Sequence, residues 1–246
     1  LPDPFGLSFA LGDGDWFSLD GVDLQRYRQA LNLNDGALER QLSFELAGHR
    51  VELLERRLVS MATPNLAVLR WELQLPPGVE VRLRSVLDGG VVNAGVERNR
   101  AYEGRRLQHL AFDHDDNGTT TLSARLHDHR QRLAMAMQLR TPGRQLQWRS
   151  TTYEQRLIQD ARCAVPDDGR LIMEKRVVVL IDEECPVTDK DARSEAWRQL
   201  PGGEYEQLEQ ASAKAWKTLW QGHSLASDDP ELQRTLLFHA FHLLQN

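Results

Sequence analysis

Residues 37–75, ALERQLSFELAGHRVELLERRLVSMATPNLAVLRWELQL, contain three successive segments that alternate apolar and polar residues. Alternation with a period of two is typical of half-buried β-strands. Gly48 and the sequence Thr63-Pro64-Asn65 separate the segments, and such residues form the short turns that join antiparallel neighbours. The stretch therefore predicts three antiparallel strands, at residues 37–47, 50–59 and 67–75.

The same alternation extends over most of the chain, from Leu7 to about Asp182. Further predicted strands lie at residues 80–86, 106–112, 119–127, 133–140, 145–153 and 171–181. About a dozen strands are too many for one strongly twisted open sheet, because sheets of that size tend to split into two packed layers. We therefore predict a mainly β fold, a large antiparallel β-sandwich. One segment departs from the pattern: residues 22–31 place Leu24, Tyr27, Arg28 and Leu31 at helical spacing and predict a short helix.

After Asp182 the apolar residues follow a helical period. Residues 189–199 predict a short exposed helix, and residues 204–221 predict an amphipathic helix with Trp216 and Trp220 on one stripe. A last helix is expected to begin at Asp228 or Asp229, with Pro230 in its first turn. The chain is thus divided into a sandwich at 1–186, a helical linker at 187–226 and a separate last helix at 227–246.

Composition excludes several classes of protein. The 246 residues include 30 Lys and Arg against 36 Asp and Glu, a net charge of −6 that argues against a dedicated nucleic-acid binder. No run approaches the roughly 18 apolar residues that a membrane span needs, and residues 1–11 lack the pattern of a signal peptide. With two cysteines, Cys163 and Cys185, read as reduced thiols, we expect a cytoplasmic protein. The chain starts at Leu1 and ends within an apolar helix, so we also expect the natural protein to extend beyond both ends.

Two segments could bind a metal ion. Residues 113–118, DHDDNG, match the first six positions of an EF-hand calcium loop, but Ala124 stands where the bidentate Glu should be, so a plain hairpin turn is favoured. His127-Asp128-His129 places two imidazoles on one side of a strand, and His109 and His114 could join them only if the strands pair favourably. We favour an ordinary polar strand end and predict no metal site.

An arginine-rich stretch that includes Trp148 and Tyr153 could form a sugar or nucleic-acid face, although such a stretch is more often the solvated side of paired strands. Its members are Arg125, Arg130, Arg132, Arg140, Arg144, Arg149 and Arg156. Neither cysteine precedes a helix that would activate a thiol, and no Ser, His and Asp set indicates a nucleophile. The residues alone thus identify no catalytic group, and substrate-binding residues stay unknown.

Short motifs in the expected order resemble glycoside hydrolase family 65, which contains maltose, trehalose, kojibiose and nigerose phosphorylases and some hydrolases. The N-terminal motifs are residues 31–40, Glu55 to Met61, and Ser85 to Gly89 with Asn93. Ala215-Trp216 and Leu219-Trp220 resemble the family's linker helix. Asp229-Pro230-Glu231, Gln233-Arg234 and Phe241 to Gln245 resemble the first helix of its catalytic (α/α)6 barrel.

The resemblance implies a supersandwich, a helical linker and the opening of a barrel whose catalytic Glu and phosphate-binding residues lie beyond Asn246. The fragment alone should then be inactive. The intact enzyme should cleave an α-linked glucose disaccharide with inversion, with inorganic phosphate as co-substrate and no cofactor, and a homodimer is allowed. Leu237 and His223-Ser224 depart from the family's pattern and leave subfamily and substrate open.

Two alternatives stay open beside a phosphorylase. A family 65 hydrolase such as a trehalase would need a second carboxylate to activate water. A carbohydrate-binding sandwich is supported by the β-rich body with Trp16, Trp71 and Trp148, and a purely structural domain would instead dock the barrel or a second subunit. We interpret Trp216 and Trp220 as interdomain packing, Asp88, Gly89 and Asn93 as turn residues, and Arg57 and Ser60 as ties between strands.

Overall fold

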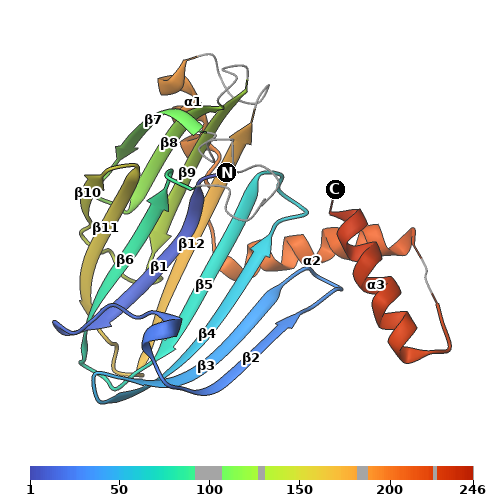
Figure 1. Cartoon of the computed structure of the whole chain (residues 1–246), viewed down its shortest axis with the longest axis horizontal. Helices are drawn as coiled ribbons and strands as arrows, with labels where there is room; N and C mark the ends of the chain where they lie inside the picture. Colours follow the sequence, from blue (N-terminus) through green and yellow to red (C-terminus); the bar gives the residue numbers. More distant parts are fainter. Residues whose placement is uncertain (92–106, 127–130, 182–187, 224–225, 246) are drawn as a thin grey trace, which may run out of the picture.

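The computed structural model describes residues 1–91, 107–126, 131–181, 188–223 and 226–245. Within these residues, twelve strands form two antiparallel sheets that face each other, which confirms the predicted sandwich (Figure 1). The smaller sheet has the order β1 (Asp3–Leu11), β6 (Glu80–Asp88), β11 (Arg156–Ala164) and β10 (Arg149–Tyr153). The larger sheet has the order β2 (Leu24–Leu31), β3 (Leu38–Leu46), β4 (His49–Val59), β5 (Leu66–Gln74), β12 (Arg170–Ile181), β9 (Arg132–Arg140), β8 (Thr119–Leu126) and β7 (Leu107–His114).

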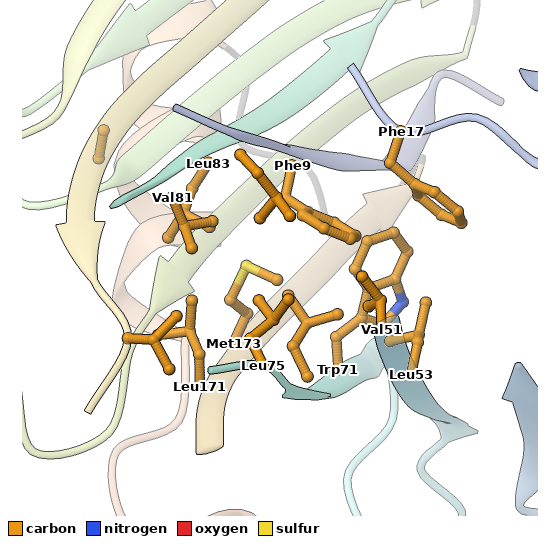
Figure 2. Close-up of a cluster of buried hydrophobic side chains, with 14 of the residues drawn as sticks. Phe9, Phe17, Val51, Leu53, Trp71, Leu75, Val81, Leu83, Leu171 and Met173 are labelled. Carbon is orange, nitrogen blue, oxygen red and sulfur yellow. The ribbon is translucent and has the colours of Figure 1, made fainter. Parts of the chain in front are cut away.

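The hydrophobic core lies between the two sheets. Figure 2 shows Phe9 and Leu83 of the smaller sheet facing Trp71 and Met173 of the larger one, and all four side chains are almost fully buried. Phe17, in the loop after β1, stacks on Phe44 of β3 with ring centroids 4.7 Å apart. Because one face of each sheet must be apolar to form this core, the strands that line it show the alternation that the sequence displays.

The predicted helix at residues 22–31 is wrong, because this segment forms β2 at the edge of the larger sheet. Almost all of its side chains are exposed, so burial imposes no two-residue period on its sequence, and the apparent helical spacing carries no structural information. Pairing with β3 decides its conformation. The predicted strand at 145–153 is shorter, since β10 begins only at Arg149, and no strand was predicted at β1 or β11.

The three predicted helices are present as α1 (Asp189–Arg198), α2 (Tyr205–Gln221) and α3 (Pro230–Leu244). Thr188 caps α1, and Asp229 caps α3 with Pro230 at its start. None of the helices in the described residues is long and apolar enough to cross a membrane. The predicted boundaries at 1–186, 187–226 and 227–246 stay a prediction, and the first of them falls within residues 182–187, which are outside the described part.

α1 and the start of α2 cover part of the outer face of the larger sheet, and α3 lies to one side of that sheet (Figure 1). Ala192 and Ala196 of α1 and Tyr205 of α2 pack against an apolar patch on β4, β5, β9 and β12. This patch consists of Leu58, Leu66, Val68, Ala134, Ala136, Val178 and Leu180. The larger sheet is therefore apolar on both faces near its middle, which is expected of a sheet covered on both sides.

Candidate functional site

A cluster of charged side chains lies beneath the segment that joins α1 to α2. Arg70 of β5 and Glu174 and Arg176 of β12 are 6%, 1% and 0% exposed. Burying isolated charges costs several kcal/mol each, so such groups need partners of opposite charge or hydrogen-bond partners. Each carboxylate oxygen of Glu174 pairs with one arginine: Oε1 lies 3.3 Å from Nη1 of Arg70, and Oε2 lies 3.0 Å from Nη2 of Arg176.

Arg176 also holds the linker backbone. Its Nη1 donates to the carbonyl oxygens of Pro201 at 2.8 Å and Gly202 at 3.0 Å, and its Nη2 donates to that of Gly203 at 2.8 Å. Burial, together with the nearby charge of Arg140, lowers the pKa of Arg176, while Glu174 opposes that shift. The Pro-Gly-Gly sequence that marks a break between helices is thus a fixed connection. We call Arg70, Glu174 and Arg176 the linker clasp.

Arg70 fastens the start of α2 to the same clasp. Its Nη1 donates to Oε1 of Glu206 at 2.7 Å, and its guanidinium lies 4.8 Å from the centre of the Tyr205 ring. The Tyr205 hydroxyl donates to Glu209 at 3.1 Å. Burial and the charge of Glu209 raise the pKa of Tyr205, so this hydroxyl stays protonated and the contact persists over the physiological pH range.

The second half of α2 contacts the turns at one end of the larger sheet. The backbone N–H of Met61 donates to the Ser212 hydroxyl at 3.2 Å, and Nε1 of Trp220 donates to the carbonyl oxygen of Leu33 at 2.9 Å. Trp216 is fully buried, and a Cβ on Gly36 would lie 2.5 Å from its Nε1. The β4–β5 and β2–β3 turns therefore fix the direction of α2.

The last helix continues this apolar contact. Phe241 of α3 stacks on Trp216, and Trp216 in turn stacks on Trp220 with centroids 6.4 Å apart. Trp216 and Trp220 thus serve in packing between helices, while the prediction that this packing joins two domains stays a prediction. Other apolar residues of α3 are exposed, namely Leu232 at 49%, Phe238 at 44% and Leu243 at 77%.

The structure describes only some of the residues that were considered as metal ligands in the sequence. Residues 113 and 114 end β7 and residues 115–118 form the β7–β8 turn, in which one carboxylate oxygen of Asp115 accepts from the N–H groups of Asn117 and Thr119. His127, Asp128 and His129 lie outside the described residues. No group of three or more His, Cys, Asp or Glu side chains in the described part is arranged to hold a metal ion.

The arginine-rich stretch is dispersed over several contacts rather than gathered on one face. Arg125 lies 3.6 Å from Asp189, and Arg156 lies 2.7 Å from Asp88, while Arg140 and Arg144 donate to backbone carbonyls. Arg130 lies outside the described residues. The acidic partners agree with the solvated-side interpretation for Arg125 and Arg156.

The tryptophans proposed as sugar platforms do not form one. Trp71 and Trp148 are 3% and 6% exposed and belong to the core, and only Trp16 is partly open. The exposed tryptophan is Trp197 of α1, which sequence reasoning missed. Burial raises the pKa of the Cys163 thiol, which agrees with an unreactive group, and Cys185 lies outside the described residues.

The structure describes most of the residues that were predicted to form turns or to tie strands together. Asp88 accepts from the N–H of Gly90 and pairs with Arg156 at the end of β6, while Asn93 lies outside the described residues. Arg57 donates to Glu55 on its own strand, and the Ser60 hydroxyl accepts from Thr63 within the β4–β5 turn. Both residues also contact a second strand, as predicted: the guanidinium of Arg57 lies 6.0 Å from the centre of the Phe5 ring of β1, and the N–H of Ser60 donates to the carbonyl oxygen of Leu66 in β5.

Sequence reasoning also missed the linker clasp. The signal was present, because Glu174-Lys175-Arg176 puts three charged residues in the middle of an otherwise apolar strand. A strand that places such residues at its centre must supply partners on both faces of the sheet. Those partners come from segments more than twenty residues away, which no local pattern identifies.

Residues 1–219 match the family described as glycosyl hydrolase family 65, N-terminal domain. An uncharacterized glycosyl hydrolase of Mycobacterium tuberculosis is 29% identical over 257 residues, covering 100% of this chain and 19% of the relative. A kojibiose phosphorylase of Halothermothrix orenii is 27% identical over 265 residues, covering 100% of this chain and 32% of that protein. The chain thus spans about a fifth to a third of the length of these relatives.

Solved structures share the fold. A protein from the human microbiome, provisionally assigned as a kojibiose phosphorylase, superposes with a TM-score of 0.83 at 14% identity, over 99% of this chain and 31% of the other. An inverting mannosidase of family GH92 from Bacteroides thetaiotaomicron gives a TM-score of 0.53 at 11% identity, over 97% of this chain and 29% of the other. At these identities the similarity establishes the fold alone.

Proposed function

This chain belongs to glycoside hydrolase family 65, and we propose that it is the N-terminal scaffold of an inverting phosphorylase that cleaves an α-linked glucose disaccharide. The observation that carries the proposal is the alignment of this whole chain with 32% of a kojibiose phosphorylase, together with the family match over residues 1–219. The relatives are three to five times longer than this chain, so the activity is proposed for the larger protein.

The proposed reaction needs one carboxylic acid and one phosphate ion. The acid protonates the leaving glycosidic oxygen, while phosphate attacks C1 of the glucose from the opposite face, so the configuration inverts. Phosphate is already an anion and needs no general base. We assign the catalytic acid to the part of the protein that follows residue 246, because the matched family model describes an N-terminal domain.

The contribution proposed for this chain is to position that following part. The linker clasp fixes residues 201–203, the sheet turns fix α2, and Trp216 fixes α3. Exposed apolar residues of α3, Leu232 and Leu243, are suited to pack against further helices. A rigid connection of this kind would hold an active site in one geometry relative to the sandwich.

The test is a product assay of the full-length protein that contains this chain. Kojibiose, maltose and trehalose are each supplied with and without inorganic phosphate, and glucose 1-phosphate and free glucose are measured. The proposal predicts that glucose 1-phosphate forms from one of these sugars only when phosphate is present. Release of glucose at the same rate without phosphate would identify a hydrolase instead.

A further inference from the structure

The outer face of the smaller sheet carries a basic groove with a volume of about 770 Å³. Four arginines line it: Arg82 and Arg84 of β6, Arg162 of β11 and Arg149 of β10. Trp16 and Asp160 line the groove beside these arginines. Such a concentration of guanidinium groups stands out in a chain whose net charge is −6.

The strand register brings the arginines together. Arg82 lies directly opposite Arg162, and Arg84 lies opposite Asp160, which in turn lies opposite Arg149. Like charges directly opposite each other on one face of an antiparallel pair destabilise the sheet. Repulsion between Arg82 and Arg162 therefore destabilises the fold, and a bound anion would reduce that repulsion.

Two of the guanidinium groups are held in place before any ligand arrives. Arg84 makes two hydrogen bonds of 2.8 Å to the carboxylate of Asp160 and lies 4.0 Å from the centre of the Trp16 ring. Arg82 lies 4.9 Å from the same ring and donates to the carbonyl oxygen of Gly14. Fixed side chains lose little conformational entropy on binding, so this arrangement favours a ligand.

The positive charge is only partly neutralised. Arg84 pairs with Asp160, and Arg162 pairs with Glu80 at 2.7 Å and with Asp13 at 3.4 Å. Arg82 and Arg149 form no ion pair with any residue that the structure describes. The Nε of Arg82 is buried and has no hydrogen-bond partner among those residues. The groove thus retains two charges without an acidic partner among the described residues.

We infer that this groove binds a phosphorylated sugar. A phosphate monoester has three acceptor oxygens and a charge near −2, so it can accept from two guanidinium groups at once, whereas a carboxylate suits one. The groove is far larger than a phosphate ion, and the amides of Gln145 and Gln147 on its rim suit sugar hydroxyls.

The groove is separate from the linker and from α1, α2 and α3. α1 and the start of α2 pack on the outer face of the larger sheet, whereas the groove is lined by residues of the smaller sheet and of neighbouring loops. A ligand in the groove would therefore not compete with the contacts that hold the linker. The inference does not depend on the proposed phosphorylase activity, because it rests on the groove alone.

Isothermal titration calorimetry on the full 246-residue chain tests the inference, with glucose 1-phosphate, inorganic phosphate and glucose as separate ligands. We expect glucose 1-phosphate to bind more tightly than phosphate, glucose not to bind, and added salt to weaken binding. Arg82→Gln and Arg149→Gln should each weaken glucose 1-phosphate binding about tenfold, the usual worth of one charge-assisted hydrogen bond.

Arg156→Gln is the matched control, because Arg156 is on the same face of β11 but pairs with Asp88 and does not line the groove. It should leave binding unchanged. Arg149 is exposed, so its substitution should not disturb folding, and it keeps the test decisive if Arg82→Gln fails to fold. Three results would overturn the inference: no binding of glucose 1-phosphate, binding equally weakened by Arg156→Gln, or phosphate binding as tightly as glucose 1-phosphate.

Discussion

Trp216 of α2 and Phe241 of α3 stack face to face, with ring centroids 4.6 Å apart and ring planes 13° apart. Both side chains are almost fully buried, although α3 has no other residue in the core. This single aromatic contact therefore carries much of the attachment of α3 to the rest of the chain.

Phe241→Ala should release α3 while the sandwich stays folded. Truncating a buried aromatic side chain typically costs about 3–5 kcal/mol, and here the loss falls on the local opening of one helix. Amide hydrogen exchange should become faster throughout α3 and stay unchanged in β5 and β12. Phe238→Ala is the control, since Phe238 is on the same helix but 44% exposed, and equal effects of the two substitutions would contradict the account.

Gly36→Ala should destabilise the chain more than Gly48→Ala. Both glycines have a positive φ, of 72° and 75°, so alanine carries a similar backbone penalty of roughly 1 kcal/mol at either position. Only at Gly36 would the new Cβ meet Trp216, whereas nothing lies within 4 Å at Gly48. Overpacking of this kind adds about 1–3 kcal/mol. Urea unfolding of both variants measures the difference, and equal stabilities would show that the close approach of α2 to the β2–β3 turn is wrong.

Arg176→Met should weaken the linker clasp strongly. The substitution leaves Glu174 with one cationic partner fewer and the carbonyls of residues 201–203 without their donor, and breaking a buried ion pair from one side costs about 3–5 kcal/mol. Limited proteolysis should then cut near residues 199–204, and urea unfolding should shift to lower concentrations.

Arg50→Met supplies the comparison for the clasp. Arg50 pairs with Glu52 at 2.9 Å, but both side chains are more than half exposed, so the loss should stay within about 1 kcal/mol. If Arg176→Met costs no more than Arg50→Met, the linker is not held by Arg176.

Lys175 gives the chain a specific pH dependence. It is fully buried between the sheets, and its Nζ donates to the carbonyl oxygens of Gly6 and Val86 at 2.9 and 3.0 Å. Burial lowers its pKa from 10.5 to about 7, an effect that the charge of Asp3 partly opposes. Between these two values the unfolded chain carries a proton that the folded chain has lost, so this residue makes stability rise with pH across that window.

The slope from Lys175 should approach 1.4 kcal/mol per pH unit in the middle of the window. Lys175→Met should remove it, while Lys190→Met, which changes an exposed lysine of α1, should keep it. Unfolding free energies measured in urea at about pH 7.5 and about pH 9.5 provide the comparison. A wild-type slope that survives in Lys175→Met would contradict the assignment.

The larger sheet could be predicted from sequence because its core strands alternate under the constraint of burial. Residues 37–47, 50–59 and 67–75 all contain such strands. The prediction failed where that constraint is missing or masked. β2 is exposed on both faces, and β11 places the polar Gln159 in the core, where its amide donates to the Ser150 hydroxyl at 3.2 Å.

The candidate sites were less accessible to sequence reasoning. The family resemblance and the sandwich fold that it implied are confirmed, and the interpretation of Trp216 as a packing residue agrees with its burial. The linker clasp and the basic groove depend on strand register and on loops that return from distant segments. Arg82 and Arg162 are eighty residues apart in the chain, and only the β6–β11 pairing makes them neighbours.

The central claim is that the catalytic acid is supplied from outside residues 1–246. The most direct measurement compares disaccharide turnover by the purified 246-residue chain and by the full-length protein, with kojibiose, maltose and trehalose in phosphate buffer. The account predicts glucose 1-phosphate from the full-length protein and no product from the 246-residue chain. Cleavage of any of these sugars by the 246-residue chain at a rate comparable to the full-length protein would contradict it.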